Sequence, residues 1–215
     1  MSLQINEKIE LVKDIVFFYI YNTMVGYLDI TIGPMFSGKT KKLIRTYRNY
    51  EEKKVVAINH SLDTRYMDNA ICSHDLEFIP SIMIDNIYDL WYNKDHVYCD
   101  MMERCTHVLI NEAQFFDRLC EVVVSMLKCG KKVFIYGLDG DFQQEKFGEI
   151  FDLIPHCDTI EKLRGFCNNC DNRSIYTKRL EENEKQVVIG NDNYAPRCRR
   201  CNNVEMNIME IQPVD

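Results

Sequence analysis

The sequence predicts an α/β fold with a doubly wound parallel sheet, followed by a small C-terminal unit of a different kind. Apolar, β-branched runs alternate with helical patterns as far as about residue 163, which is typical of strands joined by crossover helices. A glycine-rich loop separates the first run from the first helix, and two close pairs of cysteines lie in the polar sequence from residue 164. We therefore predict an N-terminal extension over 1–25, an α/β domain over 26–163 and a second domain over 164–215.

The overall composition narrows the class of partner. A chain of 215 residues with a net charge of -7 accommodates one main domain and an appendage. The negative charge argues against a nucleic-acid surface, because such surfaces are ordinarily basic. The apolar run 15–21 follows three acidic residues and is too short to cross a bilayer. We expect no nucleic acid, no membrane span and no signal peptide, and a small molecule as the partner.

The glycine-rich loop over residues 33–40 reads Gly-Pro-Met-Phe-Ser-Gly-Lys-Thr. This spacing is the pattern of the phosphate-binding loop, or P-loop, in which backbone N–H groups converge on phosphate oxygens. Lys39 then addresses the terminal phosphates and Thr40 addresses Mg²⁺. Residues 27–32 read as a strand and 41–52 as a helix, so the helix N-terminus would face the anion. The alternative is a glycine-rich turn that binds nothing. The predicted phosphate-binding residues of the loop are Gly33, Pro34, Met35, Phe36, Ser37, Gly38, Lys39 and Thr40.

A second strand is predicted over the β-branched run 54–59. Asp63 and Arg65 follow its carboxyl end, which in a parallel sheet is the edge where ligands bind. Both side chains are therefore candidates for contact with the phosphates. A surface ion pair between them is an equally simple alternative.

Residues 106–112 read as an apolar strand that ends in Asn111 and Glu112. Nucleotide-binding enzymes place a metal-directed acid at such a position, and Asn111 occupies the place where aspartate is usual. Glu112 is the candidate general base, because a carboxylate at this end of a strand reaches a hydroxyl beside the γ-phosphate. Its alternative role is to order water around Mg²⁺.

A helix over about 117–129 and a strand over 132–138 complete the predicted alternation. Phe115, Phe116 and Phe142 flank strand ends that face the ligand. A flat base fits between such rings, although core filling is the commoner fate of a single phenylalanine.

The two cysteine pairs form a metal-binding pattern. Cys167-x-x-Cys170 and Cys198-x-x-Cys201 are separated by 27 residues and match a four-thiolate Zn²⁺ site. A structural zinc would order the segment 177–197 with little core of its own, because the metal contributes folding energy directly, and this loop would close over a ligand. Disulfides or chance are the alternatives. The six scattered cysteines predict reduced, mostly buried thiols of a cytoplasmic protein.

Four further motifs lie between the P-loop and the last cysteine pair. They are Asp-Thr-Arg-Tyr at 63–66, Asn-Glu-Ala-Gln-Phe-Phe at 111–116, Leu-Asp-Gly-Asp-Phe-Gln at 138–143 and Tyr-Thr-Lys-Arg-Leu at 176–180. Together, over about residues 28–201, the motifs resemble the zinc-containing thymidine kinases of animals, poxviruses and many bacteria. The resemblance implies transfer of the γ-phosphoryl group of ATP to the 5′-hydroxyl of thymidine with Mg²⁺, and deoxyuridine is a further candidate substrate. It also implies a zinc-tied lasso loop, a homotetramer and inhibition by the triphosphate of thymidine.

The same resemblance assigns roles by position. Glu112 matches the catalytic base, while Lys39, Thr40 and Arg65 match the residues that handle phosphates and metal. Asn111 matches a ligand that reaches Mg²⁺ through water. The phosphate-binding set further includes Asp63 and Gln114. The nucleoside-binding set is Met35, Phe115, Leu138, Phe142, Thr177, Val188, Ile189, Gly190 and Tyr194, with backbone groups of 186–190 on the pyrimidine edge and Met35, Leu138 and Thr177 around the 5-methyl group.

The chain departs from the family in three places. Asn111 replaces an aspartate, which removes a charge beside Mg²⁺ but keeps an oxygen that accepts from a metal-bound water; we expect weaker Mg²⁺ binding and an active enzyme. The lasso is one residue shorter between Gly190 and Tyr194, and the N-terminal extension has no assigned counterpart.

Two other functions remain open at this point. One is a zinc-containing P-loop ATPase whose zinc unit grips nucleic acid through its basic residues. Those residues are Arg173, Lys178, Arg179, Arg197, Arg199 and Arg200, for which a solvated face is the usual interpretation. The other is a nucleotide sensor that binds the triphosphate of thymidine without nucleoside kinase activity.

Overall fold

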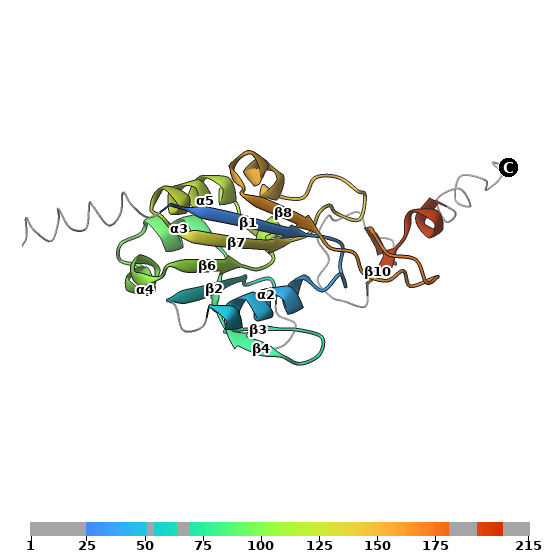
Figure 1. Ribbon diagram of the computed structural model, residues 1–215, viewed down its shortest axis with the longest axis horizontal. Helices are drawn as coiled ribbons and strands as arrows, with labels where there is room; N and C mark the ends of the chain where they lie inside the picture. The colour runs from blue at the N-terminus through green and yellow to red at the C-terminus, as the bar shows by residue number, and fades with distance from the viewer. Residues whose placement is uncertain (1–24, 51–53, 64–68, 181–192, 204–215) are drawn as a thin grey trace, which may run out of the picture.

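The computed structural model describes residues 25–50, 54–63, 69–180 and 193–203 (Figure 1). Its centre is a six-stranded sheet with the order β5-β2-β6-β7-β1-β8, in which every neighbouring pair is parallel. The strands are β1 (Tyr27–Ile32), β2 (Val55–His60), β5 (Ile82–Ile84), β6 (His107–Ile110), β7 (Lys132–Gly137) and β8 (Thr159–Lys162). The predicted parallel sheet is confirmed.

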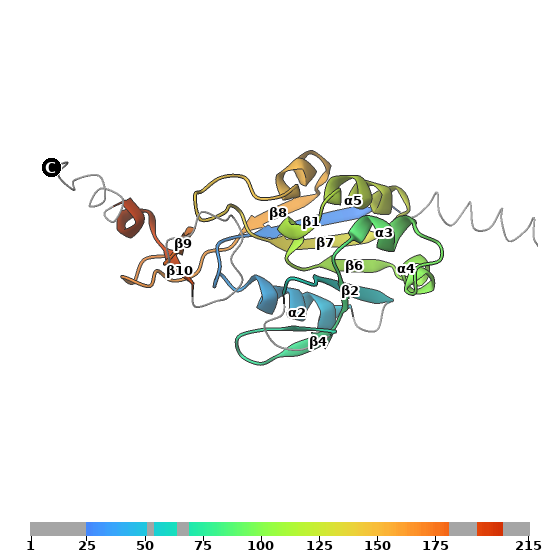
Figure 2. The same ribbon diagram turned by 180° about the vertical axis from the view of Figure 1, so that it is seen from behind.

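Helices cover both faces of this sheet, as predicted for a doubly wound fold. One face carries α2 (Lys39–Asn49) and, beside it, a hairpin of β3 (Ala70–Cys72) and β4 (Phe78–Pro80) (Figures 1 and 2). The opposite face carries α3 (Ile87–Tyr92), α5 (Leu119–Lys128) and the 3-10 helix η2 (Ile150–His156). Further short helices are α4 (Cys99–Arg104) and η1 (Ala113–Phe115), and residues 199–203 are also helical. Within the described ranges, no helix combines the length and the apolar character needed to cross a membrane.

The central strands are apolar on both faces because each face is covered. On β7, Val133 and Ile135 pack into the cluster that contains α5, whereas Phe134 and Tyr136 pack into the cluster that contains α2. Side chains of a strand alternate between faces, so a continuous apolar run is what a doubly covered strand requires. Each fully buried side chain of this size contributes about 1.5–3 kcal/mol, which makes the sheet a firm base for the loops at its edge.

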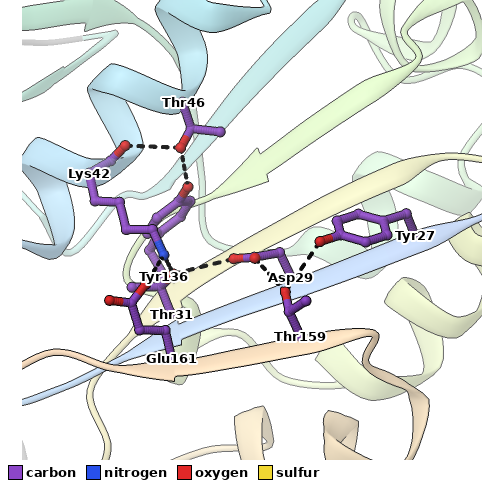
Figure 3. A network of polar contacts seen from close by, with 8 residues as sticks. All are labelled: Tyr27, Asp29, Thr31, Lys42, Thr46, Tyr136, Thr159 and Glu161. Carbon is purple, nitrogen blue, oxygen red and sulfur yellow. Dashed lines mark hydrogen bonds and ion pairs between the residues drawn. The ribbon is translucent and has the colours of Figure 1, made fainter.

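The edge strand β8 is held differently. Its four residues are all exposed, and polar contacts tie it to β1 and α2 (Figure 3). Lys42 Nζ on α2 donates to Thr31 Oγ1 and pairs with Glu161, both at 2.7 Å, while Thr159 Oγ1 donates to Asp29 at 2.5 Å. These contacts fix the two elements that flank the P-loop, the strand before it and the helix after it, against the sheet edge.

A second sheet pairs β9 (Tyr176–Arg179) with β10 (Tyr194–Arg197) in antiparallel fashion. Both views place it beyond the end of the main sheet at which β1 leads into the P-loop (Figures 1 and 2). In the described residues from 164 onward, the buried apolar residues are Cys167, Ala195 and Cys198. This unit therefore has almost no hydrophobic core.

Two expectations about burial need correction. Of the six scattered cysteines only Cys105 is fully buried, and the others are partly exposed. Among the six basic residues expected on a solvated face, Arg179 and Arg197 are buried, with 7% and 6% exposure. Both arginines alternate with partly exposed neighbours on β9 and β10. The strand register pairs Arg179 with Tyr194 and Arg197 with Tyr176, so the two buried arginines lie on opposite faces of this small sheet.

Candidate active site

The P-loop takes the conformation that its glycines allow. Gly33 has a φ of +156°, and a Cβ there would lie 2.6 Å from the carbonyl oxygen of Leu163. Gly38 has a φ of +90° at the N-cap of α2, in a backbone region that favours glycine. The helix then begins at Lys39, two residues earlier than the sequence predicted. Its first backbone N–H groups therefore belong to the loop, as anion binding at a helix N-terminus requires.

Lys39 lies folded across the loop that precedes it. Its Nζ donates to the carbonyl oxygens of Gly33 at 3.1 Å and Pro34 at 2.9 Å, and the residue is only 9% exposed. Ser37 Oγ is buried and makes no hydrogen bond to any described residue. The Lys39 ammonium and the Ser37 hydroxyl are both buried hydrogen-bond donors, which suits a loop that closes around an anion.

The P-loop also contacts the second sheet. The backbone N–H of Met35 donates to Thr177 Oγ1 on β9 at 2.9 Å. A Cβ at Gly165 would lie 2.7 Å from the carbonyl oxygen of Phe36, so the chain leading into the cysteine unit runs close against the loop. Met35 and Thr177, predicted to share one pocket, are brought together although 142 residues separate them in the sequence.

Glu112 follows β6 in a left-handed backbone conformation, with a φ of +48°. Such conformations cost free energy in a residue other than glycine and cluster at functional sites. Gln114 Nε2 donates to Glu112 Oε2 at 2.7 Å, and Gln114 Oε1 accepts from the backbone N–H of Leu138 at 3.0 Å. The buried Gln114 thus joins the candidate base to the loop after β7. The resemblance also predicts Gln114 as a phosphate ligand, and these two hydrogen bonds do not test that prediction.

Asn111 belongs to a buried chain of polar groups that runs toward β2. Its Nδ2 donates to Asn59 Oδ1 at 3.0 Å, and Asn59 Nδ2 donates to Asp63 Oδ2 at 2.9 Å. The structure thus places Asp63 at the carboxyl edge, as predicted, but against an amide. Sequence analysis did not select Asn59, although a polar residue near the end of an apolar strand was a usable signal.

His60 is a second residue at this edge that sequence analysis missed. Its ring lies 5.5 Å from Phe115 and 4.7 Å from Phe116, between ring centroids, and Phe147 meets Phe115 edge-on at 5.4 Å. Burial lowers the pKa of His60 from its ordinary value, which favours the neutral imidazole. The backbone N–H of Leu62 donates to its Nδ1 at 3.1 Å. Phe115 is therefore held in an aromatic cluster at the edge where the nucleoside is expected.

Arg179 joins two of the three aromatic residues predicted to contact the nucleoside, one from each unit. Its guanidinium carbon lies 3.7 Å from the ring centroid of Phe142 and 5.3 Å from that of Tyr194. Arg179 Nη2 also donates to the hydroxyl of Tyr194 at 2.8 Å. Guanidinium groups stack on aromatic faces favourably, so the geometry assigns Arg179 a bridging position that its sequence context concealed.

The four paired cysteines gather into one cluster. Their sulfur atoms all lie within 4.8 Å of one another, with 3.6 Å from Cys170 to Cys198 and from Cys201 to Cys170. Zn–S bonds of about 2.3 Å give a tetrahedral site with sulfur–sulfur edges of about 3.8 Å. The backbone N–H of Cys201 donates to Cys198 Sγ at 3.4 Å and lowers the pKa of that thiol, which favours the thiolate that metals bind. Donor type, number and spacing all fit Zn²⁺, and the distances do not fit disulfides.

Some predicted site residues lie outside the described part of the chain. They are Arg65, Val188, Ile189 and Gly190. Of the rest, the structure brings the P-loop, Asn111, Glu112 and Leu138 to the carboxyl ends of adjacent strands β1, β6 and β7.

Comparison with known proteins covers most of the chain. The family model described as thymidine kinase matches residues 26–202. The thymidine kinase of vaccinia virus (strain Western Reserve) is 35% identical over 182 residues, which cover 82% of this chain and 96% of the viral protein. The cytosolic thymidine kinases of Homo sapiens and Gallus gallus are 34% and 32% identical, over 82% of this chain and 73% and 76% of their own lengths. The family match extends from β1 and the P-loop to the last cysteine of the cluster.

Proposed function

Because this chain belongs to the thymidine kinase family, we propose that it transfers the γ-phosphoryl group of ATP to the 5′-hydroxyl of thymidine. One observation supports this most: the P-loop and Glu112 occupy the carboxyl ends of strands in the same sheet. A triphosphate donor and a base for the acceptor hydroxyl are the two parts that direct phosphoryl transfer needs. Deoxyuridine is proposed as a further substrate.

The proposed phosphate site is the P-loop with Lys39. Backbone N–H groups at the start of α2 and the ammonium of Lys39 would cradle the phosphates, and Lys39 would exchange its two carbonyl acceptors for phosphate oxygens. Thr40, Asn111 through water, and the loop would hold Mg²⁺, which neutralises charge on the moving phosphoryl group when bound. Arg65 is proposed to assist at the same phosphates.

Glu112 is proposed as the general base for the 5′-hydroxyl. The hydrogen bond from Gln114 fixes the orientation of the carboxylate, and Gln114 is itself anchored on Leu138. A base positioned this way lowers the entropic cost of the reactive geometry.

The nucleoside is proposed to lie between the P-loop and the second sheet. Met35, Leu138 and Thr177 would surround the 5-methyl group, with Phe115, Phe142 and Tyr194 around the sugar and base. The lasso residues Val188, Ile189 and Gly190 would supply backbone contacts to the pyrimidine edge, and the zinc at the cysteine cluster would hold both ends of the lasso.

Further properties are proposed on the family relationship. They are a homotetrameric assembly, a cytoplasmic location, as in the cytosolic relatives, and inhibition by the triphosphate of thymidine. Gel filtration with light scattering tests the assembly. The inhibition is tested by adding the triphosphate to an assay at fixed thymidine.

The decisive experiment measures ATP consumption and product formation with and without thymidine. We expect strict dependence on thymidine and stoichiometric formation of its 5′-monophosphate. Release of inorganic phosphate that is stimulated by nucleic acid and indifferent to thymidine would support a zinc-containing ATPase instead. Binding of the triphosphate of thymidine without turnover would support a sensor.

A further inference from the structure

Asn59 and Asn111 occupy equivalent places on neighbouring strands at the carboxyl edge of the sheet. Asn59 lies near the end of β2, and Asn111 follows β6 and donates its backbone N–H to the carbonyl oxygen of Ile58 at 2.8 Å. The two residues are only 1% and 2% exposed, so each amide group depends on protein partners. The chain of bonds runs from Asn111 Nδ2 to Asn59 Oδ1, and from Asn59 Nδ2 to Asp63 Oδ2.

The direction of this chain follows from its last member. An ionised carboxylate only accepts hydrogen bonds, whereas an asparagine amide offers a donor on one side and an acceptor on the other. Asp63 therefore obliges Asn59 to turn its Nδ2 toward it and its Oδ1 toward Asn111. Asn111 must therefore donate its own Nδ2 to Asn59 Oδ1. This leaves the Asn111 Oδ1 on the side away from Asn59.

We propose that Asp63 and Asn59 are positioning residues that set the orientation of the Asn111 amide, so that its carbonyl oxygen serves the metal side of the nucleotide site. This inference rests on the proposed function only for the identity of the metal-bound nucleotide. An asparagine in this environment presents an oxygen to a metal-bound water as an aspartate would. Its other terminus also satisfies the Asn59 oxygen, which an aspartate cannot do.

The same hydrogen bonds make the residue that is tolerated at position 111 depend on the residue at position 63. With Asp63 present, an aspartate at position 111 would place an oxygen against Asn59 Oδ1, acceptor against acceptor, in a buried site. Asn59 cannot reverse its amide without turning its own oxygen toward the Asp63 carboxylate. Replacing Asp63 with asparagine removes this obstacle, because an asparagine can accept from or donate to Asn59.

A double-mutant cycle tests the proposal through thermal unfolding of the full chain. Asn111→Asp alone should lower Tm by about 3–10 °C, since it leaves buried acceptors unpaired. Asp63→Asn alone should change Tm by less than about 2 °C, because its oxygen still accepts from Asn59. The Asn111→Asp/Asp63→Asn double variant should recover most of the loss, because the whole chain can reverse. Additive effects of the two substitutions would overturn the proposal.

Asn86→Asp is the matched control for the asparagine-to-aspartate change. Asn86 Oδ1 accepts from the backbone N–H of Asp89 at 2.9 Å at the start of α3, and an aspartate can make the same bond. Its Tm should stay within about 2 °C of wild type. A loss at Asn86 as large as at Asn111 would show that the substitution itself, and not the acceptor conflict, is responsible.

A second measurement separates positioning from mere packing. Binding of a non-hydrolysable ATP analogue is followed by calorimetry across a Mg²⁺ titration, so no thymidine turnover is needed. In the double variant the reversed chain would anchor a carboxylate at position 111, and half-maximal enhancement by Mg²⁺ should occur at several-fold lower concentration than in wild type. An unchanged Mg²⁺ dependence would overturn the positioning role. Failure to phosphorylate thymidine would contradict the proposed function, but it would not affect the interpretation of the double-mutant cycle, which is measured by thermal unfolding.

Discussion

The carboxyl edge of the main sheet and the cysteine unit beyond it are held together by different forces. Lys39 and Glu112 stand on elements whose apolar side chains fill two clusters, one on each face of the sheet. The cysteine unit buries almost no apolar surface in its described part and relies on four sulfur atoms within 4.8 Å of one another. The groups proposed for chemistry therefore stand on the part with an apolar core, while part of the proposed nucleoside pocket lies on the unit that is proposed to hold zinc.

In the described part of the chain, two of the contacts between these regions involve residues of the proposed nucleoside pocket. One is the hydrogen bond from the Met35 backbone to Thr177, and the other is the bridge that Arg179 forms between Phe142 and Tyr194. If the contrast is correct, substitutions in the sheet edge should affect turnover, and substitutions in the cysteine unit should affect nucleoside affinity. The predictions that follow test this division, beginning with the largest expected effect.

Glu112→Gln should lower kcat by about 10²- to 10⁴-fold, because it removes the proposed base while keeping the side chain's shape. Thymidine KM should change little, since the nucleoside pocket is untouched. Steady-state kinetics provide both values, and Glu121→Gln on the surface of α5 is the control. Turnover near the wild-type value would remove Glu112 from the base role.

Cys167→Ser, or removal of zinc by a chelator, should raise thymidine KM by about tenfold, as expected if only about a tenth of the molecules keep the lasso in its binding form. The sheet should stay folded, because its apolar clusters do not include the cysteine unit. Metal analysis, circular dichroism and kinetics check the three statements, with Cys99→Ser as the control. Cooperative loss of the whole fold would contradict the independent stability of the sheet and the predicted domain division near residue 164.

Arg179→Gln should raise thymidine KM by several-fold with little effect on kcat. The substitution removes the stacking on Phe142 and the hydrogen bond to Tyr194, which together are worth on the order of 1–3 kcal/mol, only part of which reaches the ligand. Arg179→Lys should restore the affinity partly, and Tyr194→Phe should show a smaller loss than Arg179→Gln. Equal falls in kcat and kcat/KM would place Arg179 with the sheet edge instead.

Lys42→Met should have the smallest effect, a loss in the free energy of unfolding of about 1 kcal/mol or less, because its ion pair with Glu161 is partly open to solvent, with side-chain exposures of 30% and 57%. The difference from wild type should shrink at high salt. Urea unfolding at two ionic strengths measures it. A loss of several kcal/mol would mean that polar contacts, and not the apolar clusters, hold β8 and α2 in place.

Much of the architecture could be predicted from local patterns. Continuous β-branched runs predicted β1, β2, β6 and β7, and the observed strand boundaries differ from the predicted ones by at most two residues. The P-loop spacing and the two cysteine pairs were specific enough to place a phosphate site and a metal site. Asn59, His60 and Arg179 were not singled out as site residues, because their importance arises from partners on other strands, which no local pattern reports.

What the sequence alone determined is therefore the set of chemical parts: a loop that only glycines permit, a carboxylate at the end of a strand and four thiols at metal-binding spacing. The tertiary structure decided how those parts are oriented. It paired Met35 with Thr177, buried Arg179 between two rings, and linked Asn111 through Asn59 to Asp63. The physical reason is that backbone conformation and ligand type are local properties, whereas the donor or acceptor that a buried group meets is set by packing between distant segments.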